Sequence, residues 1–523
     1  MAEAATTATE SAPSRVGGLA LAAAIVGFGF LGSRVLGILR TAIIARAFGS
    51  SPEMTAYVVA FKAPDLIFQV LAGATLGSAF IPVFARVYRR EGAEPAWRLA
   101  SNILNLVTAA TAVACVVAFI LAPWLVPLMA PGIALQGKAV FLTRLMLLSP
   151  LLFSVSGMIT GILNARQRFL LPALAPMFYN LAIIAGALFL AGPFGVTGLA
   201  IGVIAGAALH LAIQVPGLVR EGMHWRPTFE WHNPNVREVG RLMGPRVIGL
   251  GAAQLNFVVT IYFASKIGDQ TVSNLNYAWV VATLPTALFG MALSTAVFPR
   301  LADHAAEEDM EALRDTVSRV LRIIMFLTIP AAIGLALLRF PAVTLLFQWG
   351  QFTRADTSMT AAALAFFCIG IVPQAGIEIH SRGFYAMGDT RTPVMLAVFA
   401  VATNVVLSAL VWQRFEHQGL AFADSVTSAL EWVLLYAFFI RRTGASPAAD
   451  LSAIAIFTFC AAGMALFIAI AFLPFDVGGR FNQAIIALAG ATAGVLVYGA
   501  LANVLGVEEF HQAARRIRSR LPV

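Results

Sequence analysis

Charged residues are scarce in this chain, and long apolar runs take their place. Only 12% of the 523 residues are Asp, Glu, Lys or Arg, whereas 59% are hydrophobic. Soluble domains carry about 25% charged residues, so the composition excludes a soluble globular protein. The apolar runs exceed the roughly ten residues of a membrane-barrel strand, and helices satisfy their own backbone groups in lipid. The sequence therefore predicts an all-α polytopic membrane protein.

Cysteines and catalytic motifs are also rare. The three cysteines, Cys115, Cys368 and Cys460, lie far apart in apolar runs, which indicates packing residues rather than disulfides or metal ligands. The sequence holds no Walker loop, zinc motif or catalytic triad. We therefore expect neither ATP-driven transport nor hydrolysis, and a protein that is not an enzyme and needs no metal or cofactor.

Apolar windows of about 20 residues predict 14 membrane-spanning helices. The first, second and eighth are longer than a straight crossing needs and contain glycine or proline, so we expect them to be bent or broken beside a cavity. The predicted spans are 17–48, 55–85, 99–122, 138–163, 172–191, 195–219, 242–266, 273–299, 321–347, 357–386, 393–412, 419–440, 451–474 and 481–506.

The net charge of +9 follows from arginines that gather in alternate loops. This bias obeys the positive-inside rule, so it indicates membrane orientation rather than nucleic-acid binding, and it places both termini in the cytoplasm. Residues 1–16 lack the basic start of a signal peptide and are expected to form a disordered cytoplasmic N-terminus. The end of the chain, 507–523, is a basic tail that could form an amphipathic helix on the inner leaflet or a simple solvated end.

Three arginines, Arg34, Arg40 and Arg46, lie inside the first apolar segment. A charge at bilayer depth costs roughly 2.5 to 3.5 kcal/mol on insertion scales, so it usually faces a bundle interior or a wet cavity. Guanidinium groups form paired hydrogen bonds with phosphate. On a straight helix Arg34 and Arg40 are about 120° apart, so they share one face only if the helix bends at Gly37. The segment predicts a cationic cavity for an anionic group.

Each of these charges also has a structural interpretation. Arg34 and Arg40 could pair with Asp65 or with backbone carbonyls, and Arg46 could extend to the membrane surface. Lys62 and Asp65 are three residues apart and could pair with each other. Such a structural or gating pair is an alternative to contact with a substrate.

The chain also repeats itself weakly. Four pairs of short matches occur in the same order, displaced by nearly the same distance, and six spans separate the two members of each pair. This predicts two parallel lobes related by a pseudo-two-fold axis along the membrane normal, around a central cavity. The lobes are predicted at 17–219 and 242–440, with a cytoplasmic linker at 220–241 and two extra helices within 441–506. In the first match, Gly32-Ser33-Arg34-Val35-Leu36-Gly37 resembles Gly244-Pro245-Arg246-Val247-Ile248-Gly249.

Several motifs resemble the MurJ/MviN family, the lipid II flippases of bacterial peptidoglycan synthesis within the multidrug and polysaccharide exporter superfamily. The resemblance covers nearly all of 17–445 and is specific in the first two spans and in one later run. The motifs are Ser33-Arg34-Val35-Leu36-Gly37 through Arg40, Ala60-Phe61-Lys62-Ala63-Pro64, Ala79-Phe80-Ile81-Pro82, and Phe347-Gln348-Trp349-Gly350-Gln351-Phe352-Thr353.

The resemblance implies a multi-pass protein of the bacterial inner membrane. It would move undecaprenyl-diphosphate-linked disaccharide peptide (lipid II) outward by alternating access, with the lipid tail in a groove extended by the last two spans. Arg34 and Arg40 fall on two cavity arginines of the family, and Lys62 falls on a basic position. Membrane lipid and the cell-wall synthesis machinery are the expected partners, and nucleic acid is not.

Two positions depart from the family pattern. Phe68 replaces the usual arginine of the second span, and Val280 replaces the arginine expected in the eighth. We hypothesise that Arg246, the repeat-mate of Arg34, restores part of the lost charge. Alternatively, the side chain of Arg246 extends from the seventh span to the inner membrane surface.

Charges in the second half suggest a coupling site. Glu378, His380 and Arg382 cluster in the tenth span and could serve a proton-linked role or form an internal ion pair. Asn404 and Asp424 could supply oxygen ligands for sodium, and coupling to the membrane potential is the other possibility.

Two other functions remain open at the level of the sequence. The first is another transporter, either a flippase for a different polyprenyl-linked saccharide or an antiporter of the superfamily. The antiporter predicts acidic residues in the first lobe, where the deep charges are mostly basic. The second is a non-transporting membrane scaffold derived from a flippase, which the missing arginines suggest.

Overall fold

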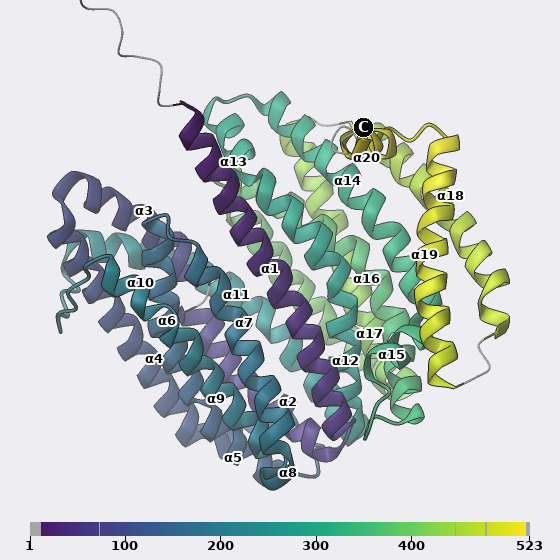
Figure 1. Ribbon diagram of the computed structural model, residues 1–523, viewed down its shortest axis with the longest axis horizontal. Helices are drawn as coiled ribbons and strands as arrows, with labels where there is room; N and C mark the ends of the chain where they lie inside the picture. Colours follow the sequence, from purple (N-terminus) through teal and green to yellow (C-terminus); the bar gives the residue numbers. More distant parts are fainter. Residues whose placement is uncertain (1–11, 73, 445, 476–478, 519–523) are drawn as a thin grey trace, which may run out of the picture. The chain divides into compact units, whose positions relative to one another are not determined.

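The computed structural model describes residues 12–72, 74–444, 446–475 and 479–518, in which every regular element is a helix (Figure 1). Among the described residues, twelve helices are long and apolar enough to cross a membrane. The all-α membrane prediction is therefore confirmed, whereas the number of 14 spans stays a prediction. Helix α1 begins at Ala12, so it already covers the end of the segment predicted to be disordered, whose first part lies outside the described residues.

The chain divides into two compact units. Unit 1 comprises the chain up to Ala47, Ala60–Leu125 and Gly137–Leu250, and unit 2 comprises Phe48–Val59, Val126–Gln136 and the chain from Gly251 onward. This division differs from the predicted boundaries in two ways. The predicted linker belongs with unit 1, and two short segments of the first half belong with unit 2.

Side chains of α4 (Ala93–Met129) hold the linker in unit 1. The linker backbone is irregular over 223–230, so its polar groups need partners outside regular structure. Buried Asn102 donates to the carbonyl of Glu230 at 3.0 Å, and Asn105 donates to the carbonyl of Arg226 at 2.8 Å. The linker then enters α11 (Pro234–Ile267), which continues without a break into the seventh span.

Hydrogen bonds to the start of α12 (Asp269–Pro285) explain why the two short segments belong with unit 2. Thr55 donates its hydroxyl to the Asp269 carbonyl, and Ala134 donates its N–H to the Asp269 carboxylate at 2.9 Å. These contacts anchor both connections to the lobe that follows them in the sequence.

In unit 1, α1 (Ala12–Phe48) packs closely on α7 (Leu170–Ala185). A Cβ atom at Gly29 would lie 2.6 Å from the carbonyl oxygen of Ala173, so the small residue permits this approach. The other elements of unit 1 are the second half of α2 (Pro52–Ile67), η1 (Phe68–Ala72), α3 (Ala74–Glu91), most of α4, α5 (Gln136–Met146), α6 (Leu148–Ala165), η2 (Gly186–Leu190), α8 (Ala191–Phe194), α9 (Val196–Ala212) and α10 (Val215–Arg220), together with the first part of α11.

The second and eighth spans are both interrupted by a π-helical turn. Turn η1 follows α2, which contains Pro64, and η3 (Thr286–Met291) follows Pro285 at the end of α12. The two turns stand at corresponding places of the sequence repeat, and proline removes one ladder hydrogen bond in each helix. The prediction of broken helices is confirmed for these two spans. The first span is not broken, because α1 is one continuous α-helix, and a bend in it stays a prediction.

Unit 2 is built around α16, which packs on α12, α14 and α17. Helix α17 contains a kink at Glu416 (φ 48°, ψ −135°), so it consists of two arms that correspond to two predicted spans. The helices that follow η3 are α13 (Ala292–Ala306), α14 (Met310–Leu337), α15 (Arg339–Phe347), α16 (Arg354–Ala386), α17 (Arg391–Thr443), α18 (Ala448–Ala471), α19 (Arg480–Val504) and α20 (Glu508–Arg518).

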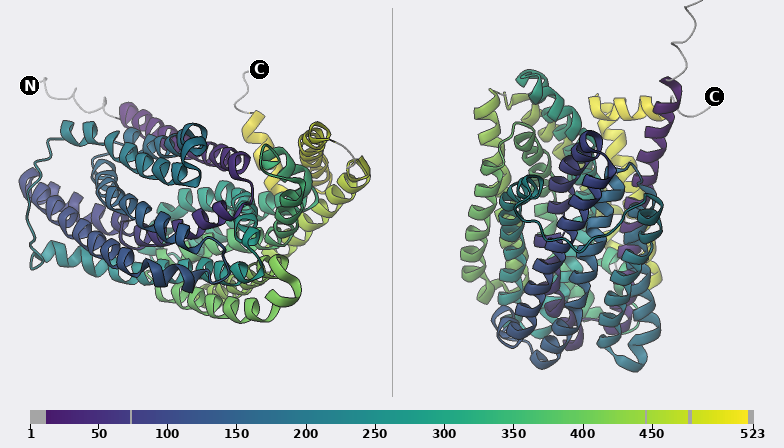
Figure 2. Two further views of the ribbon diagram at one scale, coloured as in Figure 1. Left: turned by 90° about the horizontal axis from the view of Figure 1, so that it is seen from below. Right: turned by 90° about the vertical axis from the view of Figure 1, so that its left-hand side faces the viewer.

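The last two long helices, α18 and α19, lie side by side in unit 2 (Figure 1). They share a buried cluster with α14, in which Phe326 contacts the rings of Phe457 and Tyr498. Helix α20 turns away from the axis of α19 (Figure 2), and Phe510 packs against Gly499. The predicted helix in the basic tail is therefore confirmed over Glu508–Arg518, while its contact with a membrane surface stays a prediction.

Candidate functional site

Arg40 is held between α1 and α7 in unit 1. Its guanidinium donates to the side-chain oxygen of Asn180 at 3.1 Å. Asn180 is buried and donates in turn to the carbonyls of Ser33 at 3.3 Å and Pro176 at 3.0 Å. Asn180 therefore bonds between α1 and α7, and it fixes the position of Arg40.

Arg34 lies along α1 itself. Its guanidinium carbon is 5.2 Å from the centre of the Phe30 ring, and its side chain is half-buried. In the described part of the chain, no carboxylate pairs with either Arg34 or Arg40. The predicted pairing of these arginines with Asp65 is wrong, and both keep positive charge available for an anionic ligand.

The two arginines do not converge on one partner. Arg40 reaches α7, whereas Arg34 extends over Phe30, and α1 carries no break at Gly37 that would turn them to one face. A group as large as a diphosphate could still contact both. Arg46 is exposed in the last turn of α1, which agrees with a side chain that extends to the membrane surface.

Lys62 and Asp65 lie on α2 and interact electrostatically. Gln69 of η1 donates to both carboxylate oxygens of Asp65, at 3.3 and 3.2 Å. The structure therefore supports the interpretation of Lys62 and Asp65 as a pair. It places this pair directly before the π turn of the second span.

Aromatic contacts surround the two positions where the resemblance predicts arginine. The ring of Phe68 lies 4.8 Å from that of Phe153. Trp279, next to Val280, contacts the rings of Phe257 at 5.3 Å and Phe367 at 5.4 Å. Apolar packing takes the place of positive charge at both. Arg246 lies within α11, but its side chain falls outside the part that the structure describes.

The predicted charged cluster of α16 divides into two parts. Glu378 and Arg382 form an ion pair one turn apart, and Arg382 also donates to Thr295 of α13 at 2.9 Å. His380 is buried on another side of the helix, against the rings of Tyr436 and Phe439. The internal ion pair accounts for the first two residues, and His380 belongs to a separate environment.

Oxygen atoms gather around Asp424 in unit 2. Asn256 of α11 donates to one carboxylate oxygen of Asp424 at 2.7 Å. The second oxygen of Asp424 and the side-chain oxygen of Asn256 are buried and have no hydrogen-bond partner among the described residues. Asn404 is also buried, and its side-chain oxygen accepts from Ser408 at 3.2 Å. Sequence reasoning missed Asn256, because nothing in a sequence pattern pairs residues so far apart.

A second buried polar network lies in unit 1 and was also missed. Ser156 is 2.6 Å from Nδ1 of His210, Gln214 donates to Ser156 at 2.8 Å, and Thr160 donates to Gln214 at 2.7 Å. Ser156 and Thr160 lie four residues apart on α6. His210 and Gln214 have the same spacing, with His210 in the last turn of α9 and Gln214 just after it. That spacing of polar residues in apolar spans could have predicted two facing helices.

Outside the spans, the carboxylate of Glu221 accepts hydrogen bonds from Arg166 at 2.8 Å and from Arg168 at 2.7 Å, and it forms an ion pair with each. The hydrogen bond from Arg168 and then that from Arg166 hold the pKa of Glu221 below its ordinary value, against the opposing effect of burial. This ion-pair network links the connection after α6 to the end of α10.

Together, the fold and these residues define a polytopic membrane transporter with two related lobes, in the first of which Arg34 and Arg40 have no carboxylate partner among the described residues. The family described as "Lipid II flippase MurJ" matches residues 44–483. The chain therefore belongs to this family.

Individual relatives agree with this assignment. The lipid II flippase MurJ of Burkholderia cenocepacia is 33% identical over 422 residues, which cover 79% of this chain and 82% of the relative. A solved structure of the lipid II flippase MurJ in an inward closed conformation has a TM-score of 0.79 and 23% identity, covering 92% of this chain and 98% of that one. An inward-facing multidrug resistance MATE family transporter of the MOP superfamily has a TM-score of 0.65 and 17% identity, covering 79% and 94%. The similarity to these two solved structures shows the fold.

Proposed function

We propose that this protein is a lipid II flippase of the bacterial inner membrane, in which Arg34 and Arg40 bind the diphosphate. Family membership supports the activity. The observation that carries the assignment of residues is that both arginines lie in a membrane span without a carboxylate partner among the described residues. A diphosphate of about two negative charges needs at least two cationic donors, and guanidinium groups form charge-assisted hydrogen bonds to it.

The two arginines contribute differently to binding. Asn180 already positions Arg40. This contact uses only part of the hydrogen-bonding capacity of the guanidinium group, so the rest can bind a ligand. Arg34 is restrained only by Phe30, so it can adjust to the ligand. Lys62 supports this charge from α2, and Arg246 adds to it from α11. The electrostatic interaction between Lys62 and Asp65 favours a gating role for Lys62 beside the π turn over direct contact with the phosphate.

The π turns η1 and η3 are the elements that change shape during alternating access. Each interrupts one long helix of its lobe, and such turns are common at functional hinges. The membrane potential supplies energy, since moving one elementary charge across 100 mV is worth about 2.3 kcal/mol. The membrane potential is negative on the cytoplasmic side, so it drives an anionic headgroup outward. The arginines of the loops indicate that both termini lie in the cytoplasm.

Sodium is the second proposed source of energy, and its site is Asn256, Asn404 and Asp424. The second carboxylate oxygen of Asp424 and the side-chain oxygen of Asn256 are buried without donors among the described residues, and such oxygens suit a hard cation. Within α17, Val411 contacts Gly419 across the kink. Because the two arms run in opposite directions, this register sets Asn404 at about the depth of Asp424.

A sodium titration of the purified protein tests this site. Sodium should raise the melting temperature of wild type relative to equal concentrations of choline, since a ligand that binds only the folded state stabilises it. The Asp424→Asn variant should lose that increase, whereas Glu378→Gln, which alters an ion pair elsewhere in the lobe, should keep it. An equal sodium effect in wild type and Asp424→Asn would refute the site.

The scaffold is the second candidate function, and it is favoured by the aromatic contacts at Phe68 and Trp279 that replace expected charges. A flippase for another polyprenyl-linked saccharide has the same cationic requirement. An antiporter is less consistent with the first lobe, where Asp65 is already engaged by Gln69 and Lys62. The cell-wall synthesis machinery is the proposed protein partner.

Complementation separates these functions. Wild type, Arg34→Ala, Arg40→Ala and the matched control Arg46→Ala are expressed at equal membrane levels in a bacterium depleted of its own lipid II flippase. The proposal expects rescue by wild type and Arg46→Ala, and failure of the other two. Rescue by all four would remove the assigned residues while keeping the activity. Failure of an inserted wild type alongside rescue by a close relative would favour the scaffold or another substrate.

A further inference from the structure

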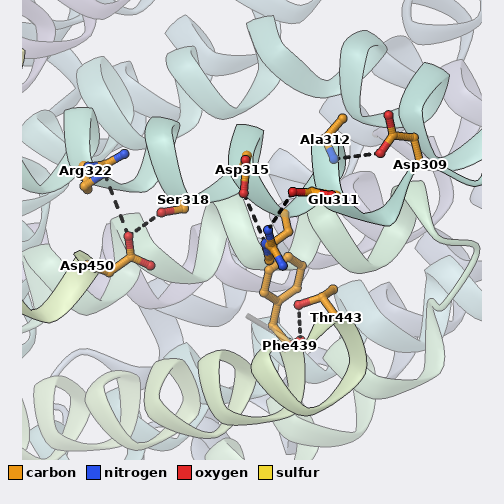
Figure 3. A network of polar contacts seen from close by, with 10 residues as sticks. Asp309, Glu311, Ala312, Asp315, Ser318, Arg322, Phe439, Thr443 and Asp450 are labelled. Carbon is orange, nitrogen blue, oxygen red and sulfur yellow. Dashed lines mark hydrogen bonds and ion pairs between the residues drawn. The ribbon is translucent and has the colours of Figure 1, made fainter. Parts of the chain in front are cut away.

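A cavity of about 360 Å³ opens in unit 2 where α14 begins and α16 ends. It lies between α14, α16, α17 and α18. Charged residues of α14 and Asp450 of α18 lie along its wall (Figure 3). The proposed flipping mechanism uses none of these groups. Arginines at this end assign it to the cytoplasmic side of the membrane.

The inner part of the cavity is rich in hydrogen-bond acceptors. Asp450 is buried, and it accepts from the hydroxyl of Ser318 and from that of Tyr436 at 3.0 Å. The nearest cation is Arg322, whose Nε is 3.9 Å from Asp450 and has no hydrogen-bond partner among the described residues. The carboxylate therefore retains acceptor capacity and an incompletely neutralised charge.

His380 adds a buried acceptor to the same wall. Its Nδ1 lies 2.8 Å from the carbonyl oxygen of Gly376, which can only accept, so Nδ1 carries the hydrogen. In the neutral ring Nε2 is then an acceptor. This atom is fully buried and has no partner among the described residues, although His380 lines the cavity. A buried acceptor of this kind needs a proton donor.

The outer part of the cavity is cationic. Arg319 is exposed and forms no ion pair within the described ranges, whereas Arg314 is engaged by Asp315 at 3.1 Å. Helix α18 begins beside the cavity at Ala448, without a capping side chain, and Ala449 of its first turn lines the wall. Free N–H groups and the helix dipole attract anions at such an end.

The cavity thus offers acceptors inside and cationic donors outside. We propose that it binds the phosphoethanolamine headgroup of a phospholipid, with the ammonium at Asp450 and His380 and the phosphate at Arg319 and the start of α18. An ammonium supplies three proton donors and a positive charge, which are what the inner wall lacks. A purely anionic ligand would leave the acceptors unsatisfied and bring negative charge toward Asp450.

Lipid binding to the delipidated, full-length protein tests the site, with native mass spectrometry as the readout. Phosphatidylethanolamine and phosphatidylcholine with identical acyl chains share the phosphate, but the choline group donates no N–H hydrogen bond. Wild type should prefer phosphatidylethanolamine about tenfold or more, the value of one charge-assisted hydrogen bond. Asp450→Asn should abolish the preference, and Arg319→Gln should weaken the binding of both lipids.

The matched control is Arg354→Gln, which removes an exposed arginine from the opposite end of α16 and should change neither affinity. Arg319 is exposed, so Arg319→Gln keeps the test decisive if Asp450→Asn does not fold. Equal binding of the two lipids by wild type would overturn the proposal, as would unchanged binding by Arg319→Gln.

Soluble glycerophosphoethanolamine distinguishes the two sources of the headgroup. Its displacement of the lipid from wild type, but not from Arg319→Gln, would support the site and show that the free headgroup is sufficient. Retention of the lipid, with binding still lowered in Arg319→Gln, would support the site as one for an intact phospholipid.

Discussion

At the scale of single residues, Arg34 and Arg40 differ in how firmly the fold holds them. Arg40 is tied to Asn180, which is itself bonded to two backbone carbonyls, whereas Arg34 contacts only the ring of Phe30. Ordering a free arginine side chain costs up to about 2 kcal/mol of conformational entropy. The energetic cost of ligand binding therefore falls mainly on Arg34, and Arg40 provides a fixed point of attachment.

The sequence was sufficient to find both arginines, because a charge in an apolar span stands out whatever the fold. It could not predict that Arg40 bonds to Asn180, nor that Asn256 meets Asp424 or that His380 faces the cavity beside Asp450. Those contacts join residues far apart in the chain, and helical periodicity carries no information about them.

The ion pairs of Glu221 predict a dependence of stability on pH. Because Arg168 and Arg166 lower the pKa of Glu221 from its ordinary value of 4.5, the folded state binds fewer protons than the unfolded state there. The stabilisation is present above that value and is lost as pH falls through the lower folded pKa. Between about pH 5 and pH 3, the melting temperature of wild type should therefore fall further than that of Glu221→Gln, as measured by thermal unfolding in detergent.

A matched variant for this experiment is Glu53→Gln, which removes an acidic residue from the start of α2 and has no ion pair among the described residues. It should retain the acid dependence of wild type. Identical pH profiles for wild type and Glu221→Gln would show that the network contributes nothing to stability.

At the scale of elements, close packing of α9 depends on glycines spaced four residues apart. Gly198 and Gly202 lie on the face that contacts η2 and α7. A Cβ atom at Gly198 would stand 2.4 Å from the carbonyl oxygen of Leu190, which is backbone and cannot rotate away. Small residues at this spacing let membrane helices approach closely, so this contact fixes the lobe that carries Arg40.

The substitution Gly198→Ala should destabilise unit 1 by about 1 to 3 kcal/mol, because the helices must separate to accept the methyl group. The measurement is the melting temperature of the purified protein. Gly192→Ala is the control, since a Cβ atom there meets nothing within 4 Å. An unchanged melting temperature for Gly198→Ala would contradict the close approach of α9 to η2.

Element breaks were predictable only where proline stands inside a span. The second and eighth spans are interrupted after Pro64 and at Pro285, as expected. Glycine alone was a poor guide, because α1 remains helical through Gly32 and Gly37. In α1 the glycines serve packing instead, since Gly32 accommodates the side chain of Met177 of α7.

At the scale of the whole molecule, the two lobes share a sequence repeat but carry different chemistry. Unit 1 holds the arginines without carboxylate partners, and unit 2 holds buried oxygens around Asp424 and the cavity beside Asp450. The repeat predicted two related lobes, and proline within long spans predicted interruptions in the second and eighth spans. The repeat could not predict this division, because the differences between two copies of a repeat reside in individual side chains.

In the proposed mechanism, Arg34 and Arg40 bind the lipid-linked diphosphate during transport. The most direct measurement is the rate of lipid II translocation in proteoliposomes with an imposed membrane potential. Arg34→Ala and Arg40→Ala should each lower the rate at least about tenfold, the value of one charge-assisted hydrogen bond. Asn180→Ala should lower it less, because Arg40 keeps its charge and loses only its anchor. Wild-type rates in both arginine variants, with Arg46→Ala as the reference, would contradict the account.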